Sequence, residues 1–222
     1  MLPKVIIYNT ISLDGALNFF NYNSKYYYEI ASKLDIDAVL MGSNTLLKEI
    51  NSETGELYNW KNLGYEIEPI SLLVVPDSEG KIRIWSKVLE IPFVNDILVL
   101  CSRSTPQEYM NFLDELDIKY MIIGYGQVNF NIALEELNIQ FGIKSLRVNS
   151  GGTLNGILLQ DDLADELCIL LNPVIGGTST NPIYTTSNLE NPGKAIDLKL
   201  IKVEQLKNEI IFLQYRVMKY QF

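Results

Sequence analysis

Residues 144–159 read Lys-Ser-Leu-Arg-Val-Asn-Ser-Gly-Gly-Thr-Leu-Asn-Gly-Ile-Leu-Leu, and this stretch combines a strand pattern, a glycine turn and the start of a helix. Leu146 and Val148 alternate as in a short strand, and an apolar helical stripe begins after Thr153. Between them, Ser150-Gly151-Gly152 forms a turn that presents free backbone N–H groups and a positive helix end to a phosphate. Glycine also lets a pyrophosphate approach the main chain closely. The alternative is a tight strand-to-helix turn that binds no ligand.

Composition and charge limit the classes of protein to which the chain can belong. Apolar residues make up 47% of the 222 residues and charged residues 20%, so we expect one soluble globular domain over residues 1–222. The formal net charge of −9 argues against nucleic acid or an anionic membrane as partner. No apolar run reaches the roughly 20 residues of a membrane span, and the first residues lack the layout of a secretory signal. We therefore expect a cytoplasmic protein.

Histidine is absent from the sequence, which excludes Ser–His–Asp and Cys–His catalysis and removes the commonest transition-metal ligand. Cys101 and Cys168 stand alone, without the spacing of a metal site or a redox pair. We expect both to be buried as small hydrophobic residues, and we expect no metal site. An enzyme of this composition has to use a bound cofactor or carboxylates.

Strand and helix patterns alternate along most of the chain. Strands are expected at residues 5–8, 37–41, 70–75, 96–100, 120–123, 146–148 and 163–171, and helices at 26–33, 46–50, 106–116, 130–141 and after 153. Residues 51–68 show no clear period and predict a loop. Residues 198–206 and 210–218 predict an antiparallel hairpin. This order predicts an α/β layered fold with a mainly parallel central sheet and an antiparallel C-terminal hairpin.

Glycines follow several of these strands and precede helices. Gly42, Gly124 and the Gly151-Gly152 pair each occupy such a junction, and Thr45 lies in the first helical turn after Gly42. Because the carboxyl ends of parallel strands meet at one edge of a sheet, one ligand with several phosphates could contact all these junctions. This favours a dinucleotide over ligand-free turns, although Gly124-Tyr-Gly126 lacks the third glycine of the standard dinucleotide fingerprint.

Two other strand ends carry side chains that could contact a ligand. Ser102 and Arg103 could bind a nucleotide 2′-phosphate by charge-assisted hydrogen bonds; the alternative is an exposed arginine without a partner. Ser12 and Asp14 follow the first strand, where α/β sheets bind ligands; the alternative is an ordinary Ser/Asp/Gly turn.

Five motifs in register carry a resemblance to a known family. They are Ser12-Leu-Asp-Gly15, Asp37-Ala-Val-Leu-Met-Gly-Ser-Asn-Thr45, Ser150-Gly-Gly-Thr-Leu-Asn155, Asp162-Leu-Ala-Asp-Glu-Leu167 and Pro173-Val-Ile-Gly-Gly177. In this order they resemble the reductase domain of riboflavin biosynthesis, the RibD C-terminal domain, in the dihydrofolate-reductase-like group that includes archaeal diaminopyrimidine reductases. The resemblance implies a dihydrofolate-reductase-like three-layer fold, a homodimer, and hydride transfer from NADPH to a ring-opened ribosylamino-pyrimidine phosphate.

The resemblance also implies roles for matching residues. Together with Gly124 from the strand ends, the expected cofactor contacts are Gly42, Thr45, Ser102, Arg103, Ser150, Gly151, Gly152, Thr153 and Leu154. The expected substrate contacts are Ser12, Asp14 and Asn149, with Asp14 as the catalytic carboxylate. In such a site the orientation of the nicotinamide against an imine-like carbon supplies much of the rate, and a carboxylate or water supplies the proton.

The chain departs from the family mainly in the substrate half. Ala16 stands where lysine is usual, Asn149 stands where glutamate is usual, and the arginine expected after Thr45 is absent. Two alternatives therefore stay open. One is a dihydrofolate or pterin-type reductase, for which Glu29 is the only carboxylate of the first helical region. The other is a non-catalytic NADP-binding relative that has lost its substrate contacts.

Overall fold

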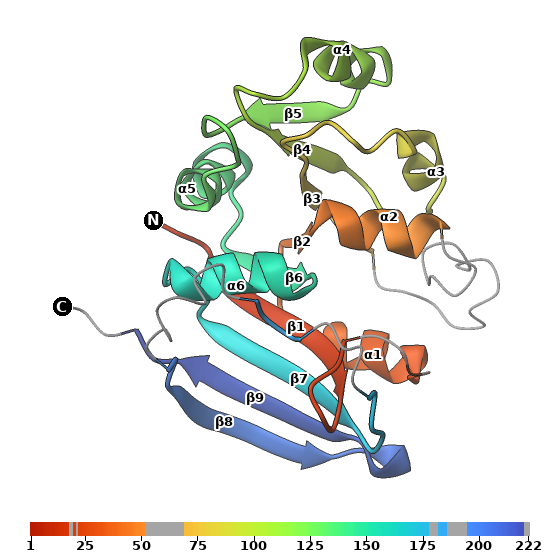
Figure 1. Ribbon diagram of the computed structural model, residues 1–222, viewed down its shortest axis with the longest axis vertical. Coiled ribbons are helices and arrows are strands. Elements are labelled where there is room, and N and C mark those ends of the chain that lie inside the picture. Colours follow the sequence, from red (N-terminus) through yellow and green to blue (C-terminus); the bar gives the residue numbers. More distant parts are fainter. Residues whose placement is uncertain (18–19, 21, 52–68, 178–181, 186–194, 220–222) are drawn as a thin grey trace. The chain divides into compact units, whose positions relative to one another are not determined.

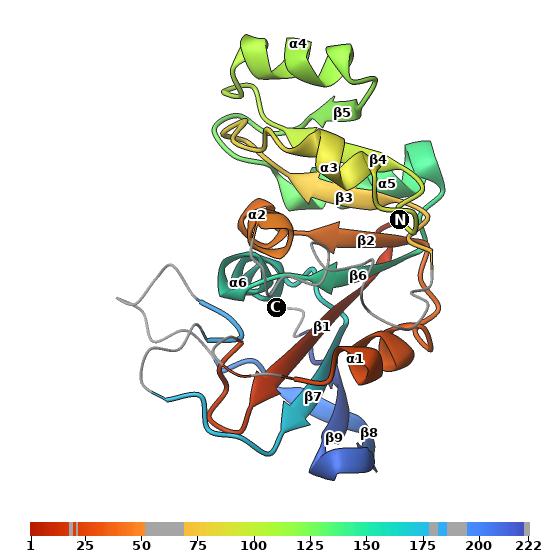
Figure 2. The same cartoon turned by 90° about the vertical axis from the view of Figure 1, so that its right-hand side faces the viewer.

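The computed structural model of the chain describes residues 1–17, 20, 22–51, 69–177, 182–185 and 195–219 (Figures 1 and 2). Its contacts divide it into two units. Unit 1 contains Met1–Pro3 and Tyr28–Leu146, and unit 2 contains Lys4–Tyr27 and Arg147–Phe222. Because each unit joins segments that are far apart in the sequence, we keep a single domain over residues 1–222 as a proposal.

A parallel sheet with the strand order β5-β4-β3-β2 forms the centre of unit 1. Its strands are β2 (Ala38–Met41), β3 (Leu73–Pro76), β4 (Ile97–Cys101) and β5 (Lys119–Ile122). The first three are buried at every position except Pro76, which explains why their sequences are continuous apolar runs. Since the strands run in the same direction, the residues that follow them emerge at one edge of this sheet.

Helices flank the sheet of unit 1 on both sides. They are α2 (Ser43–Asn51), α3 (Trp85–Leu89), α4 (Gln107–Glu115) and α5 (Phe130–Phe141). Alternate strand residues such as Val39, Val75 and Val99 share a buried cluster with α2, α3 and α4. Figure 1 shows α5 on the other side of the sheet from α2 and α3. In the cluster, Trp85 Nε1 donates to the Tyr109 hydroxyl at 3.0 Å, and burial raises the pKa of that phenol.

The sheet of unit 2 combines parallel and antiparallel pairs in the order β1-β7-β9-β8. β1 (Lys4–Ser12) pairs in parallel with β7 (Glu166–Asn172). β9 (Ile211–Val217) is antiparallel to β7 and to β8 (Leu198–Gln205). A 3₁₀ turn over Lys207–Glu209, with Asn208 at φ 59°, joins β8 to β9. The predicted α/β fold with a mainly parallel sheet and a C-terminal antiparallel hairpin is therefore confirmed.

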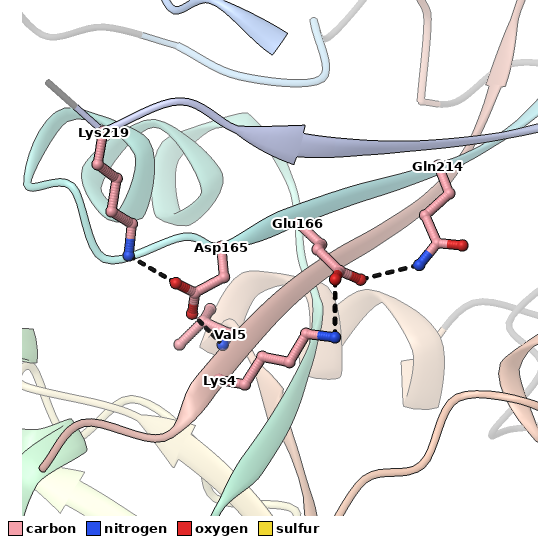
Figure 3. Close-up of polar contacts among 6 residues, drawn as sticks. All are labelled: Lys4, Val5, Asp165, Glu166, Gln214 and Lys219. Carbon is pink, nitrogen blue, oxygen red and sulfur yellow. Dashed lines mark hydrogen bonds and ion pairs between the residues drawn. The ribbon is translucent and has the colours of Figure 1, made fainter. Parts of the chain in front are cut away.

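Two carboxylates, Asp165 and Glu166, connect the start of β1 with the start of β7, with β9 and with Lys219 beyond the end of β9 (Figure 3). Lys4 Nζ lies 2.7 Å from Glu166 Oε1, and Gln214 Nε2 donates to Glu166 Oε2 at 2.9 Å. Asp165 accepts from Val5 N at 2.8 Å and from Lys219 Nζ at 2.7 Å. These bonds fix the strand register of unit 2, because each carboxylate contacts two different strands or their ends.

Three further elements complete the described structure. They are α1 (Ser24–Ala31), β6 (Ser145–Asn149) and α6 (Gly152–Gln160), and the chain passes from one unit to the other within α1 and within β6. The strand, turn and helix predicted from residues 144–159 are confirmed. The loop predicted at residues 51–68 lies outside the described residues except for Asn51, which ends α2.

Candidate functional site

The N-terminus of α6, in unit 2, keeps the backbone donors that the sequence predicts. Gly151 is the N-cap residue, with φ −83° and ψ −179°, and provides no side-chain cap. The Asn155 N–H donates to the Gly151 carbonyl at 3.3 Å. A Cβ on Gly151 would meet no heavy atom within 4 Å among the described residues, so the space beside this turn is open. The N–H groups that precede Asn155 and the positive helix end can therefore bind an anion.

The neighbouring glycines of α6 make room for the chain itself. A Cβ on Gly152 would lie 2.6 Å from the Pro182 carbonyl oxygen, and one on Gly156 would lie 2.0 Å from that of Thr185. The Thr185 N–H also donates to the Gly152 carbonyl at 2.8 Å. Residues 182–185 thus cover this side of the helix, and Gly152 can offer a ligand only its N–H group.

Two buried asparagines, Asn9 and Asn155, stabilise the turn before α6, and the sequence patterns predict a role for neither. Asn155 Nδ2 donates to Asn9 Oδ1 at 2.9 Å, to Ile183 O at 2.8 Å and to Ser150 O at 3.3 Å. Asn9 Nδ2 donates to the same Ser150 carbonyl at 2.9 Å. The signal in the sequence is an asparagine placed among the apolar residues of the α6 stripe. Leu154 is buried, so it too can offer a ligand only its backbone.

Asp14 joins two loops of unit 2 that are far apart in the sequence. Its carboxylate accepts hydrogen bonds from the Ser12 hydroxyl at 2.5 Å, from Gly176 N at 2.8 Å and from Gly177 N at 2.9 Å. The Ser12 oxygen also accepts from Ala16 N at 2.9 Å. The structure therefore brings the predicted residues Ser12 and Asp14 together and adds the loop at residues 173–177.

These hydrogen bonds change the acidity of Asp14. The Ser12 hydroxyl and then the Gly176 N–H stabilise the charged form, and they lower the pKa of the carboxyl to about 2. At neutral pH the side chain is an anion that accepts hydrogen bonds. A carboxylate with this pKa is a poor proton donor, so the arrangement favours a positioning role for Asp14 over a role as general acid.

In unit 1, the loops after β4 and β5 are joined by hydrogen bonds. Arg103 N donates to Gly124 O at 3.2 Å and Ser104 N donates to Tyr125 O at 3.0 Å. Ser102 is fully buried, and its hydroxyl lies 2.9 Å from that of Ser104. Gly124 has φ +90°, and a Cβ there would lie 2.1 Å from Gln127 O. Ser102 and Gly124 therefore shape the loop. The Ser102 hydroxyl bonds within the protein, and the Gln127 carbonyl fills the space where a side chain at residue 124 would lie.

Arg103 is the exposed cation of this pair of loops. Its guanidinium lies 5.7 Å from the ring centroid of the exposed Tyr125. It also lines a pocket of about 450 Å³ whose walls combine apolar residues such as Ile122 and Ile132 with Glu136 and Gln140. An arginine beside an exposed aromatic ring suits a phosphorylated nucleoside, since the charge can bind phosphate while the ring stacks on a base.

Gly42 and Thr45 lie at the corresponding edge of β2. The Gly42 carbonyl accepts from Leu46 N at 2.9 Å as α2 begins, and Thr45 is half-buried in the first helical turn. In unit 1 the structure thus places Gly42 and Thr45 after β2, and brings Ser102, Arg103 and Gly124 together after β4 and β5. In unit 2 it places Asn149 at the end of β6, directly before the turn to α6.

The two cysteines are free and buried, as predicted. Burial raises the pKa of both the Cys101 and Cys168 thiols to about 12, so neither forms a thiolate near neutral pH. Among the described residues, no cluster of three or more Cys, Asp and Glu side chains is placed to hold a metal ion. None of the helices in the described ranges has the length and apolar character needed to cross a membrane.

The class of protein follows from a comparison with known families. Residues 3–212 match the model of the RibD C-terminal domain, and the chain therefore belongs to this family. The family resemblance drawn from the five sequence motifs is thus confirmed.

Individual relatives agree with this classification. The chain is 28% identical over 193 residues to the 2,5-diamino-6-ribosylamino-4(3H)-pyrimidinone 5′-phosphate reductase of Aquifex aeolicus, covering 81% of both chains. It is 27% identical over 198 residues to the reductase of the same name from Archaeoglobus fulgidus, covering 82% of this chain and 85% of the relative. The structure is similar to that of a pyrimidine reductase-like protein from Corynebacterium diphtheriae, with a TM-score of 0.75 and 15% identity over 98% of this chain and 93% of the other. This last similarity concerns the fold alone.

Proposed function

We propose that the protein is an NADPH-dependent reductase that acts on a diaminopyrimidine ribosylamino-phosphate of riboflavin biosynthesis. The observation that carries the proposal is the open, uncapped N-terminus of α6 at Gly151, found in a chain whose curated relatives are named as reductases of that class over more than 80% of both lengths. A helix start of this kind suits the pyrophosphate of a dinucleotide.

Each of the two units presents residues that suit a part of such a cofactor. The N–H groups of Gly151, Gly152 and Thr153 would bind phosphate at the start of α6, and Gly42 and Thr45 would do so at the start of α2. Arg103 would bind the 2′-phosphate of the adenosine and Tyr125 would stack on its base. Ser102 and Gly124 would keep this loop in shape through their contacts inside the protein. The bound nicotinamide supplies the hydride, and the protein supplies its orientation.

Asp14 has a positioning role in this proposal. Its carboxylate fixes the Ser12–Ala16 turn against residues 173–177 through three hydrogen bonds. With a pKa of about 2 it remains charged throughout the neutral range, so the proton that completes the reduction would come from water. Ser12 and Asn149 stay proposed substrate contacts.

The alternative of a pterin-type reductase is less well supported. Glu29 is half-exposed on α1, with its Oε1 3.6 Å from Lys33 Nζ in an i,i+4 pair. A solvated carboxylate paired along its own helix is poorly suited to bind a buried pterin, because the hydrogen bonds of that ring need a desolvated partner. The non-catalytic alternative is decided by the assay below.

A homodimer and a cytoplasmic location also remain proposals. β8 lies at the end of the strand order in unit 2 and exposes Leu198, Leu200, Ile201 and Val203. An edge strand with several exposed apolar residues is a common feature of protein interfaces. A second copy of this chain is the partner proposed for it.

The test of the proposed function is NADPH oxidation with the diaminopyrimidine phosphate as substrate. We expect turnover with NADPH and weaker turnover with NADH. In Arg103→Ala the advantage of NADPH over NADH should fall about 10- to 100-fold, because a hydrogen bond to a charged group contributes about 1.5–3 kcal/mol.

Arg83→Ala is the matched control, since Arg83 is an exposed arginine of unit 1 that lies over the rings of Tyr109 and Phe112. It should leave the coenzyme preference unchanged. No NADPH oxidation with the diaminopyrimidine phosphate, or equal use of both coenzymes by the unmodified protein, would contradict the proposal.

A further inference from the structure

β6 carries two polar groups that have no partner in the described structure. Arg147 is 6% exposed, and its Nε makes no hydrogen bond. Asn149 stands two residues further along the strand, and its buried Oδ1 also makes none. Residues i and i+2 of a strand point to the same face of a sheet. The strand thus presents an unused donor and an unused acceptor on one face, while Leu146 and Val148 are buried on the other.

No described carboxylate neutralises the charge of Arg147. Its guanidinium carbon lies 5.9 Å from the centroid of the Tyr8 ring. Tyr8 is itself held in place, since its hydroxyl donates to Tyr27 O at 2.6 Å and its ring lies 4.6 Å from that of Tyr27. No carboxylate in the described ranges forms an ion pair with Arg147. A buried cation without a counter-ion is costly, and such groups concentrate at binding sites.

The pairing of one donor with one acceptor limits the chemistry of the ligand. A phosphate or carboxylate would suit Arg147, but it would place a second acceptor against Asn149 Oδ1. An amide edge, in which a carbonyl oxygen stands beside an N–H group, satisfies both. A pyrimidinone ring carries such an edge, and a ribosyl phosphate does not.

We propose that Arg147 and Asn149 bind the amide edge of the substrate's pyrimidinone ring from this face of β6. The guanidinium donates to the ring carbonyl oxygen, and the ring N–H donates to Asn149 Oδ1. This inference rests on the proposed function and names the part of the substrate that unit 2 recognises. It also gives a reason for asparagine at residue 149, since a carboxylate there would pair with Arg147 and occupy it.

The test measures binding of the ring alone and does not depend on turnover. The probe is 2,5,6-triaminopyrimidin-4-one, titrated calorimetrically, and the comparison probe is the same ring methylated on the amide nitrogen. We expect Arg147→Met and Asn149→Leu each to weaken binding of the first probe at least tenfold. Asn149→Leu should bind both probes equally, because the group that distinguishes them has been removed. Arg216→Met, an exposed arginine on β9, is the control and should bind like the unmodified protein.

Stability separates this role from a structural one. Arg147→Met removes a buried unpaired charge and keeps the volume of the side chain, so the urea midpoint of the free protein should stay the same or rise. A lowered midpoint together with unchanged ring binding would assign Arg147 to the core and overturn the inference.

Failure of the ring to bind the unmodified protein would overturn the inference as well. If the ring binds but NADPH is not oxidised with the complete substrate, the proposed function fails while this inference stands.

Discussion

The turns after β5 and after β6 both carry two glycines, yet they differ in what the glycines do. Gly124 has φ +90°, and the space of its missing Cβ is taken by Gln127 O. Gly151 has extended backbone and open space beside it, at an uncapped helix start. The first glycine allows the chain to turn on itself, and the second leaves room for a ligand. A glycine at a strand end is therefore compatible with a phosphate site only where the protein itself does not fill the space beside it.

The largest expected effect concerns the turn after β5. Gly124→Ala should lower the free energy of unfolding by about 2–4 kcal/mol, because the new Cβ overlaps a backbone oxygen and the residue is held at positive φ. Gly126→Ala is the matched control, since a Cβ there meets no described atom within 4 Å. Urea denaturation of both variants measures the difference. Equal stability of the two variants would show that the Gln127 carbonyl does not exclude a side chain at residue 124.

The next effect concerns the turn after β6. Gly151→Val should leave the free energy of unfolding within about 0.5 kcal/mol of the original, because the backbone is extended and the space is open. It should weaken NADPH binding at least tenfold, about 1.4 kcal/mol, since the side chain occupies the path of the phosphate. Titration of nicotinamide fluorescence measures this loss. Unchanged affinity for NADPH in a well-folded variant would show that the cofactor does not bind at this turn.

The smallest effect concerns Asp14, whose carboxylate joins two loops of unit 2 through hydrogen bonds. The pKa of Asp14, about 2 in the folded protein, lies below the usual value of 3.8 for an aspartate. A depressed pKa gives stability that is complete above the unfolded value and is lost as the pH falls through the folded value. The unmodified protein should therefore lose this contribution between about pH 4 and pH 2.

Asp14→Asn should remove that part of the pH dependence and be less stable at pH 7, because its amide nitrogen cannot accept from Gly176 or Gly177. Asp35→Asn, at an exposed carboxyl after α1, serves as the control. Urea midpoints at pH 7, 4 and 2.5 measure the difference. Parallel pH profiles for Asp14→Asn and the unmodified protein would show that the carboxylate does not hold the two loops.

The local sequence patterns predicted the order of the helices and strands correctly but missed the short helix α3. The stretch at residues 144–159 gave a strand, a turn and a helix where they were expected, because alternation, glycine chemistry and helical period are all local properties. α3 was not predicted, since its five residues are too few to show a helical period. The strand expected at 163–171 begins only at Glu166, after residues 163 and 164 have turned back toward the end of α6.

Residue type and spacing are enough to predict the fold class, the glycine junctions and the absence of histidine chemistry. Which of those junctions are open, and which groups bond the polar side chains, depends on how the chain packs. Asp14 meets Gly176 across 162 residues, and Asn155 meets Asn9 across 146. Hydrogen bonds of this range depend on strand register, and no local pattern encodes their partners. For the same reason, only the folded chain shows that Arg147 is buried without an ion-pair partner among the described residues.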